Sequence, residues 1–264
     1  MMSWRDNIMK GIEMNREHEG KHYLVIGASS GIGESVTLEL ASLGANITML
    51  ARRTEKMEAI LKKMPARNHK YYGFDVTQID EIFNIVAKIY EEQGKVDGCV
   101  YAAGVGDIMR LRDLTYERLH HVMQVNFYPF VEFVRAMISK KLRKDAMHIV
   151  AISSMASVSS DRYFTPYSAS KAAMDAAVRC LARELVTRNV TINSIRPAVV
   201  NVERLRHLDE ITEGGLNKQI IDNGYQPLGL IPARDIAKAT AYLLSNAANY
   251  ITGTTMFFNG GAAC

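Results

Sequence analysis

The sequence predicts an α/β protein built on a doubly wound parallel sheet in a single domain. Short apolar, β-rich runs alternate with longer helical patterns along the chain, and a glycine-rich turn follows the first run. No linker, repeat or low-complexity stretch divides the pattern. Strict alternation of strand and helix indicates a parallel sheet with helices on both faces. Right-handed crossovers between the strands make such a sheet doubly wound.

The elements follow from the spacing of apolar residues. Strands are predicted at Tyr23–Ile26, Asn46–Leu50, Tyr71–Phe74, Gly98–Tyr101, His148–Ile152, Thr191–Ile195 and Thr255–Phe258. Helices are predicted at Gly31–Leu43, Glu55–Met64, Ile79–Gln93, Thr115–Ser139, Tyr167–Thr187 and Pro232–Ser245. Residues 1–18 are an N-terminal extension, and residues 19–264 form the domain. Residues 201–226 interrupt the alternation beyond a strand end, where we expect a substrate lid.

Composition excludes several classes of protein. With 264 residues, 48% of them hydrophobic and 23% charged, the chain has material for a packed core and is neither disordered nor fibrous. The net charge of +4 is too mild to indicate nucleic acid. Cys99, Cys180 and Cys264 form no CxxC pair, which disfavours a disulfide framework and a zinc site. We expect no metal at His120-His121 either, because adjacent helical residues point in different directions.

Two further absences predict a cytoplasmic protein. No apolar run approaches the roughly 18 residues that a membrane span needs. The N-terminal 22 residues mix acidic and basic side chains and contain no apolar core of a secretory signal. We therefore expect no membrane association.

The glycine-rich turn Gly27-Ala28-Ser29-Ser30-Gly31-Ile32-Gly33 follows the first strand. Glycines allow a tight turn and a close approach of the backbone to a pyrophosphate at a helix N-terminus, where free N–H groups favour negative charge. The sequence therefore predicts a dinucleotide site, with an ordinary strand-to-helix turn as the alternative. The expected cofactor-binding residues of this turn are Gly27, Ser29, Ser30, Gly31, Ile32 and Gly33.

The residues after the second strand bear on the choice of coenzyme. An acidic residue there would accept a bond from the ribose 2′-OH of NAD, whereas an Arg suits the 2′-phosphate of NADP. The sequence has Arg52 and Arg53, which favours NADPH over NADH. The alternative is a solvated basic face, an interpretation that suffices for Lys62, Lys63 and Lys70. Asp75 is a candidate acceptor for the adenine amino group.

Tyr167 and Lys171 are four residues apart on one predicted helix, so both side chains lie on the same face, one turn apart. A nearby ammonium favours the phenolate over the phenol, whose pKa is ordinarily about 10, and makes Tyr167 a usable proton donor near neutrality. Ser154, just past the strand His148–Ile152, is a candidate to hold a carbonyl oxygen near the same hydroxyl. The alternative for this spacing alone is a plain amphipathic helix.

Together these motifs resemble the short-chain dehydrogenase/reductase family, over about residues 20–261. The resemblance is carried by Gly27, Gly31 and Gly33, by Asp75-Val76, by Asn126, Ser154, Tyr167 and Lys171, by Pro197, and by Pro227-Leu228-Gly229, Asp235-Ile236-Ala237 and Thr252-Gly253. General similarity extends to beta-ketoacyl carrier-protein reductases. The resemblance implies a Rossmann fold that binds a nicotinamide coenzyme.

The resemblance also implies residue roles. Tyr167 is the general acid that protonates the carbonyl oxygen as hydride arrives, and Lys171 assists it and contacts the nicotinamide ribose. Ser154 polarises the carbonyl, and Asn126 holds a backbone kink and a water that serves a proton relay. The remaining cofactor-binding positions are Val76, Ala103, Gly104, Pro197 and Val200, besides Tyr167 and Lys171 themselves.

The sequence departs from the family pattern at several positions. Ile26 replaces a Thr, and Tyr101-Ala102 replaces an Asn-Asn pair, so side-chain bonds that brace the central strands are expected to be lost. Ala198 replaces a Gly and Val202 a Thr, which leaves backbone groups at Val200 to hold the nicotinamide amide.

The leading functional hypothesis is NADPH-dependent reduction of a ketone, either a 3-oxoacyl thioester or a sugar, steroid or other alicyclic ketone. The alternatives are an NAD-dependent alcohol dehydrogenase and a non-catalytic NADP-sensing protein. The family also forms dimers through its two long helices, so a homotetramer or a homodimer is expected. The apolar residues offered for that interface are Phe127, Phe130, Val131, Val134, Ala172, Ala176 and Leu181.

Overall fold

A computed structural model describes residues 17–107, 109–139, 144–159, 162–203 and 221–262. A seven-stranded sheet runs through the centre in the order β3-β2-β1-β4-β5-β6-β9, and all six strand pairs are parallel. The order reverses between β1 and β4, which is the point where doubly wound sheets open a crevice for ligands. The predicted fold class is thereby confirmed.

The strands of this sheet are β1 (His22–Ile26), β2 (Asn46–Ala51), β3 (Lys70–Gly73), β4 (Gly98–Tyr101), β5 (Met147–Ile152), β6 (Val190–Pro197) and β9 (Thr255–Phe258). The helices are α2 (Gly31–Ser42), α3 (Thr54–Leu61), α4 (Ile82–Gln93), α5 (Tyr116–Asn126), α6 (Tyr128–Met137), α7 (Ala156–Ser159), α8 (Thr165–Leu185) and α11 (Ala233–Leu244). A separate two-stranded ladder pairs β7 (Val200–Asn201) with β8 (Ile231–Pro232). The sequence did not predict this ladder.

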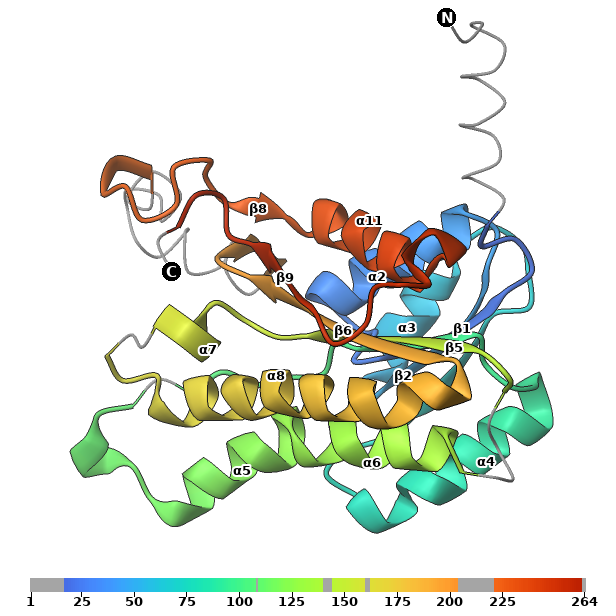
Figure 1. Cartoon of the computed structure of the whole chain (residues 1–264), viewed down its shortest axis with the longest axis horizontal. Helices are drawn as coiled ribbons and strands as arrows, with labels where there is room; N and C mark the ends of the chain where they lie inside the picture. Colours follow the sequence, from blue (N-terminus) through green and yellow to red (C-terminus); the bar gives the residue numbers. More distant parts are fainter. Residues whose placement is uncertain (1–16, 108, 140–143, 160–161, 204–220, 263–264) are drawn as a thin grey trace, which may run out of the picture.

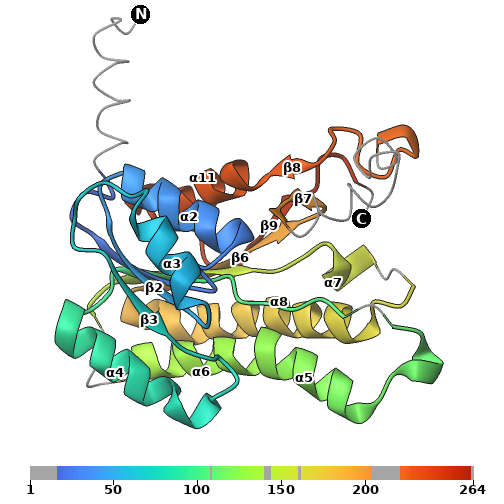
Figure 2. The ribbon, with the colours of Figure 1, turned by 180° about the vertical axis from the view of Figure 1, so that it is seen from behind.

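Helices cover the sheet on both faces. In Figures 1 and 2, α4, α5, α6 and α8 lie on one side and α2, α3 and α11 on the other. Each face has its own apolar core, one against α4, α6 and α8 and the other against α2, α3 and α11. The central strands β1 and β5 are buried along their whole length, as expected of parallel strands packed on both faces.

The long helix predicted over Thr115–Ser139 is wrong, because two helices meet at Phe127. Pro129 lies in the first turn of α6 and has no N–H to donate to the Val125 carbonyl, so the helical ladder breaks there. The Tyr101 hydroxyl, buried beneath the junction, donates to that carbonyl at 2.6 Å. We expected Tyr101, in place of an Asn, to remove a side-chain hydrogen bond. Its hydroxyl instead makes a hydrogen bond to the Val125 carbonyl.

Other boundaries differ by a few residues. The helix predicted from Tyr167 begins at Thr165, and Pro197 is the last residue of β6. His18, at the end of the predicted extension, is buried, and its Nδ1 lies 2.8 Å from the Tyr23 hydroxyl. Residues 1–16 of that extension, and residues 204–220 of the predicted lid, lie outside the described part of the chain.

Candidate coenzyme and active site

The glycine turn after β1 is packed so closely that neither Gly27 nor Gly33 leaves room for a side chain. Gly27 has a φ of +84°, and a Cβ placed on it would lie 2.4 Å from the Ala103 nitrogen. A Cβ on Gly33 would lie 2.2 Å from the Gly27 carbonyl oxygen. The turn therefore sits directly against the residues that follow β4, at the reversal point of the sheet.

The same turn fits the pyrophosphate of a dinucleotide. Helix α2 begins at Gly31, and its N-cap residue Ser30 makes no side-chain capping bond. The first N–H groups of a helix have no partner within the helix, and together with the helix dipole they attract anions. Gly31, with a φ of +60°, and Ile32 open this helix. A pyrophosphate at this end would meet backbone N–H donors.

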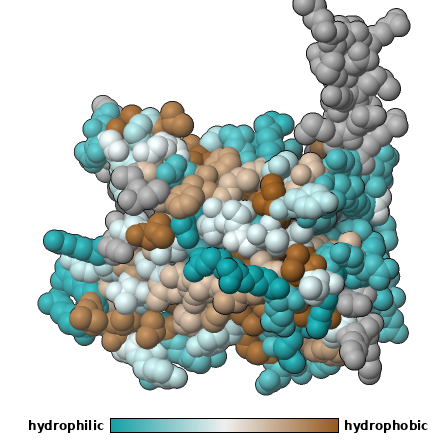
Figure 3. Space-filling model, in the orientation of Figure 1, coloured by the Kyte–Doolittle hydropathy of each residue, from teal (hydrophilic) through white to brown (hydrophobic). Residues whose placement is uncertain are grey.

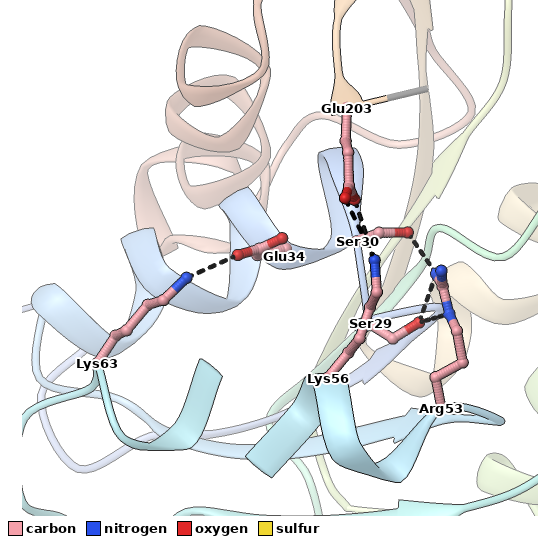
Figure 4. Close-up of polar contacts among 7 residues, drawn as sticks. All are labelled: Ser29, Ser30, Glu34, Arg53, Lys56, Lys63 and Glu203. Carbon is pink, nitrogen blue, oxygen red and sulfur yellow. Dashed lines mark hydrogen bonds and ion pairs between the residues drawn. The ribbon is translucent and has the colours of Figure 1, made fainter. Parts of the chain in front are cut away.

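Arg53 reaches the turn from the end of β2. Its guanidinium donates to the Ser29 hydroxyl at 3.0 Å and to the Ser30 hydroxyl at 2.7 Å (Figure 4). Arg52 points elsewhere, because its Nη1 lies 3.8 Å from the Asp75 carboxylate. The sequence predicts the same role for Arg52 and Arg53. In the structure Arg53 contacts the glycine turn, whereas Arg52 contacts Asp75.

Asp75 and Val76 follow β3. The Asp75 carboxylate accepts bonds from the Thr77 backbone N–H at 3.0 Å and from the Thr77 hydroxyl at 2.9 Å. Partial burial pushes the pKa of Asp75 upward, but these bonds and the charge of Arg52 outweigh that effect and hold it below its ordinary value. Asp75 therefore remains an ionised acceptor, and the Val76 side chain beside it is buried.

Lys171 is buried on α8 and faces the end of β5. Its Nζ donates to the Ile152 carbonyl at 2.7 Å and lies 5.9 Å from the centre of the Tyr167 ring. Burial lowers the pKa of Lys171 to about 8, against the opposing effect of the Asp175 carboxylate. Lys171 thus stays close to Tyr167 and joins α8 to the strand that leads into Ser154.

Asn126, at the end of α5, clamps the loop after β4. Its Oδ1 accepts the Val105 N–H at 2.8 Å, and its Nδ2 donates to the Val105 carbonyl at 3.0 Å. A Cβ on Gly104 would lie 3.4 Å from Asn126 Oδ1 and 3.5 Å from Lys171 Nζ. Asn126 and Lys171 therefore both approach Gly104, which has no side chain.

Ser154 lies two residues past β5 and two residues before α7. Its hydroxyl accepts the Ala156 N–H at 3.2 Å, and the Met155 N–H donates to the Pro197 carbonyl at 2.8 Å. The loop after β5 is thereby joined to the end of β6. The four predicted catalytic residues all come from the carboxyl side of the sheet, the side on which α/β proteins bind ligands.

The backbone just before Val200 is held by the buried side-chain amide of Gln226, which no sequence pattern predicts. Gln226 Oε1 accepts the Val199 N–H at 2.8 Å, while its Nε2 donates to the Val199 carbonyl at 3.1 Å and to the Gly229 carbonyl. Val200 then pairs with Ile231 in the β7–β8 ladder. The backbone proposed to hold the nicotinamide amide is fixed from behind by these bonds.

Sequence reasoning also missed Ser170. Its hydroxyl accepts from Asn126 Nδ2 at 2.9 Å and donates to the Tyr167 carbonyl at 2.7 Å. Ser170 thus connects two of the predicted catalytic residues. Its position in the sequence, between Tyr167 and Lys171, is the feature from which its place in the site could have been predicted. For Gln226, no local pattern marks a residue that bonds the backbone 27 positions earlier.

Two kinds of feature are absent from residues 17–107, 109–139, 144–159, 162–203 and 221–262. Within them, no three His, Cys, Asp or Glu side chains gather as ligands for a metal ion. Nor is any helix in these ranges long and apolar enough to cross a membrane.

The chain is similar to known oxidoreductases over most of its length. A family model described as enoyl-(acyl carrier protein) reductase matches residues 27–263. The 3-oxoacyl-(acyl-carrier-protein) reductase FabG of Escherichia coli K12 is 31% identical over 247 residues, which cover 92% of this chain and 97% of that protein. Glucose 1-dehydrogenase of Gluconobacter oxydans is 29% identical and covers 92% of this chain and 91% of its own.

Solved structures show the same architecture. A short-chain type dehydrogenase/reductase from Mycobacterium ulcerans superposes with a TM-score of 0.84 at 26% identity, covering 92% of this chain and 90% of the other. L-Sorbose reductase from Gluconobacter frateurii, solved with NADPH and L-sorbose, has a TM-score of 0.86 over 94% of this chain and 98% of the other, but at 22% identity it supports the fold alone. Fold and site together define a nicotinamide-coenzyme oxidoreductase. The chain belongs to the short-chain dehydrogenase/reductase family and is an NAD(P)-dependent oxidoreductase.

Proposed function

We propose that this protein uses NADPH to reduce a ketone to an alcohol, with Tyr167 as the general acid. The observation that carries the proposal is the approach of Asn126 and Lys171 to Gly104, with Lys171 Nζ 5.9 Å from the centre of the Tyr167 ring, at the sheet edge that also holds the glycine turn. The coenzyme, when bound, supplies the hydride. The protein supplies a proton donor, a cation and a binding pocket.

Each residue has a distinct part in this proposal. The Tyr167 phenol donates its proton to the carbonyl oxygen, and the Lys171 ammonium stabilises the phenolate left behind. Because the pKa of Lys171 is about 8, the ammonium form predominates at pH 7. The Ser154 hydroxyl holds the carbonyl oxygen, and Asn126 positions the start of α8 through Ser170.

The preference for NADPH rests on charge at the adenosine end. Arg53 is aimed at the turn by its bonds to Ser29 and Ser30, and Arg52 is 68% exposed beside Asp75. Guanidinium groups bind phosphate oxygens well. The glycine turn, Asp75, Val76, Ala103, Gly104, Pro197 and Val200 complete the proposed coenzyme site.

A substrate panel tests the reaction. Candidates are a 3-oxoacyl thioester, a keto sugar and an alicyclic ketone, each followed by loss of reduced-nicotinamide absorbance with NADPH and with NADH. FabG of E. coli, at 31% identity, favours the thioester, and glucose 1-dehydrogenase, at 29%, favours a sugar. Faster turnover with NADH would favour the NAD-dependent alcohol dehydrogenase. Coenzyme binding without turnover of any ketone would favour a sensor.

Tyr167→Phe tests the acid. The variant keeps the ring and removes the proton donor, so we expect turnover to fall by about 10²–10⁴-fold. The affinity for NADPH, measured by reduced-nicotinamide fluorescence, should change little. Near-full turnover of a competent substrate by Tyr167→Phe would exclude this role.

We further propose that the protein is a homotetramer or a homodimer that associates through α5, α6 and α8. Phe130 and Val134 belong to the chain's own core, which removes them from the expected interface. Ala172 and Ala176 on α8 are exposed, as are Tyr116 and Tyr128. In Figure 3 hydrophobic residues are interspersed with hydrophilic ones over the lower part of this face. A monomer in sedimentation at micromolar concentration would contradict this assembly.

A further inference from the structure

Lys56 and Glu203 form an ion pair across the proposed coenzyme site. Lys56 lies in the first turn of α3, and Glu203 lies just beyond β7. The Lys56 Nζ is 3.1 Å from one carboxylate oxygen of Glu203 and 3.4 Å from the other. This contact joins parts of the chain that are 147 residues apart, and neither residue is part of the glycine turn.

The ion pair is located at the phosphate-binding part of the site. Val202, next to Glu203, would touch a Cβ on Gly31 at 3.4 Å. Arg53, three residues before Lys56, bonds to Ser29 and Ser30 of the same turn. Figure 4 shows Arg53 and Lys56 approaching the Ser29–Ser30 turn from α3, with Glu203 coming from the opposite segment. Two cations and one carboxylate thus gather beside the first residues of α2.

We propose that Lys56 is a specificity-determining residue, and that NADP(H) binding replaces the Glu203 carboxylate on Lys56 with the adenosine 2′-phosphate. This inference rests on the proposed use of NADPH. A phosphate monoester carries a charge of about −1.5 to −2 at pH 7, against −1 for a carboxylate. The phosphate is therefore the stronger partner for the ammonium.

Replacing Glu203 with a phosphate on Lys56 costs little free energy, because the ion pair is exposed to solvent. The Lys56 and Glu203 side chains are 38% and 69% exposed, and exposed ion pairs contribute little net stability. Glu203 can return to water when it loses Lys56, so no buried charge is left behind. NADH, which has only a 2′-hydroxyl, offers no anion to replace the carboxylate, so the ion pair would persist in its complex.

Two small probes isolate the phosphate from the rest of the coenzyme. Adenosine 2′,5′-bisphosphate and 5′-AMP differ by the 2′-phosphate alone, and calorimetry on the full chain measures the affinity of each. We expect Lys56→Gln to weaken the bisphosphate by roughly 5- to 10-fold and 5′-AMP by less than about 2-fold. Glu203→Gln should tighten the bisphosphate by roughly 2- to 5-fold, because a competing and repelling carboxylate is gone.

The chain offers a matched control. Lys63 and Glu34 form another exposed pair between the end of the α3 region and α2, with Nζ and Oε1 3.4 Å apart. Figure 4 shows it at the left of the view, away from Arg53 and the Ser29–Ser30 turn. Lys63→Gln should leave the affinities for both probes unchanged. Lys56→Arg should retain most of the preference for the bisphosphate, because it keeps a cation at the position.

The outcomes separate this inference from the function on which it rests. Equal weakening of both probes in Lys56→Gln, or an equal effect of Lys63→Gln, would overturn the assignment of Lys56. A lower melting temperature of Glu203→Gln with unchanged affinity would make the ion pair purely structural. Unmodified protein that binds neither NADPH nor NADH, by reduced-nicotinamide fluorescence, would instead refute the proposed function itself.

Discussion

The two edges of the parallel sheet differ in how far their polar side chains are exposed to solvent. At the amino edge, His18, His22, His69 and His148 are all buried. At the carboxyl edge, Arg52 and Glu203 are largely exposed, and Lys56 is 38% exposed. The amino edge thus holds four buried imidazoles, whereas the part of the carboxyl edge beside the glycine turn presents charges to solvent.

The partners of these groups differ as well. His22 Nε2 and His148 Nδ1 each lie 2.8 Å from a threonine hydroxyl of the adjacent strand. His69 Nδ1 accepts the Ile47 N–H at 3.1 Å, so that nitrogen carries no proton and the imidazole is neutral. The partners in all three bonds belong to neighbouring strands of the sheet.

At the carboxyl edge the partners are ones that a ligand can replace. Arg53 bonds to two serine hydroxyls of the turn, and Lys56 pairs with an exposed carboxylate. A phosphate offers these cations a stronger acceptor than either. The groups beside the glycine turn thus have partners that a charged ligand can displace, whereas the histidines of the amino edge are bonded within the fold.

The carboxyl edge also contains an ion pair that is buried, like the histidines of the amino edge. Asp175 on α8 and Arg196 near the end of β6 are 3% and 8% exposed, with Arg196 Nη2 2.7 Å from the carboxylate. Asp175 also accepts from the Ser194 hydroxyl at 2.9 Å, and Arg196 lies over the Phe257 ring. This pair is enclosed by the protein.

Asp175→Asn should give the largest loss of stability. It leaves the Arg196 charge buried without a carboxylate, which typically costs about 3–5 kcal/mol. Urea unfolding of the variant measures the loss. The matched exposed variant Glu58→Gln, which removes the pair with Lys62, should change stability by less than about 1 kcal/mol. Equal losses would mean that burial does not distinguish the two pairs.

A second variant separates the charge from the packing. Replacing both partners, Asp175→Asn with Arg196→Met, leaves no buried charge and should be less destabilising than Asp175→Asn alone. If the double variant is the less stable of the two, the ion pair itself stabilises the junction of α8 and β6.

Much of the fold could be predicted because its signals are local. The glycine turn, the alternation of strand and helix, and the spacing of Tyr167 and Lys171 are all readable within short windows. The break at Phe127 also had a local signal, since Pro129 lies inside the predicted helix and cannot donate to the Val125 carbonyl. Only the structure shows that Tyr101 takes the place of that donor.

The remainder depends on contacts between distant residues. Lys56 with Glu203, and Gln226 with Val199, have no sequence pattern because their partners come from other elements. The two-residue strands β7 and β8 are too short to produce a periodic signal. The different directions of Arg52 and Arg53 depend on Asp75 and on the serines of the turn.

The amino edge makes the chain sensitive to acid through its buried histidines. Burial, with the charge of Lys21, lowers the pKa of His18 to about 4, against about 6.5 in an unfolded chain. The unfolded state therefore binds more protons between these two values, and stability falls as the pH falls through that window. Above about pH 6.5 this contribution to stability is fully present.

His18→Asn isolates this effect. An Asn side chain can still bond to the Tyr23 hydroxyl, the partner of His18 Nδ1, but it does not titrate. Between pH 7 and pH 5, the unfolding free energy of the unmodified protein should fall by about 2 kcal/mol more than that of the variant. Burial also lowers the pKa of His22, His69 and His148, so the variant should retain part of the acid sensitivity. Urea unfolding of both proteins at each pH gives the comparison, and identical pH dependence would show that His18 is not held neutral at the amino edge.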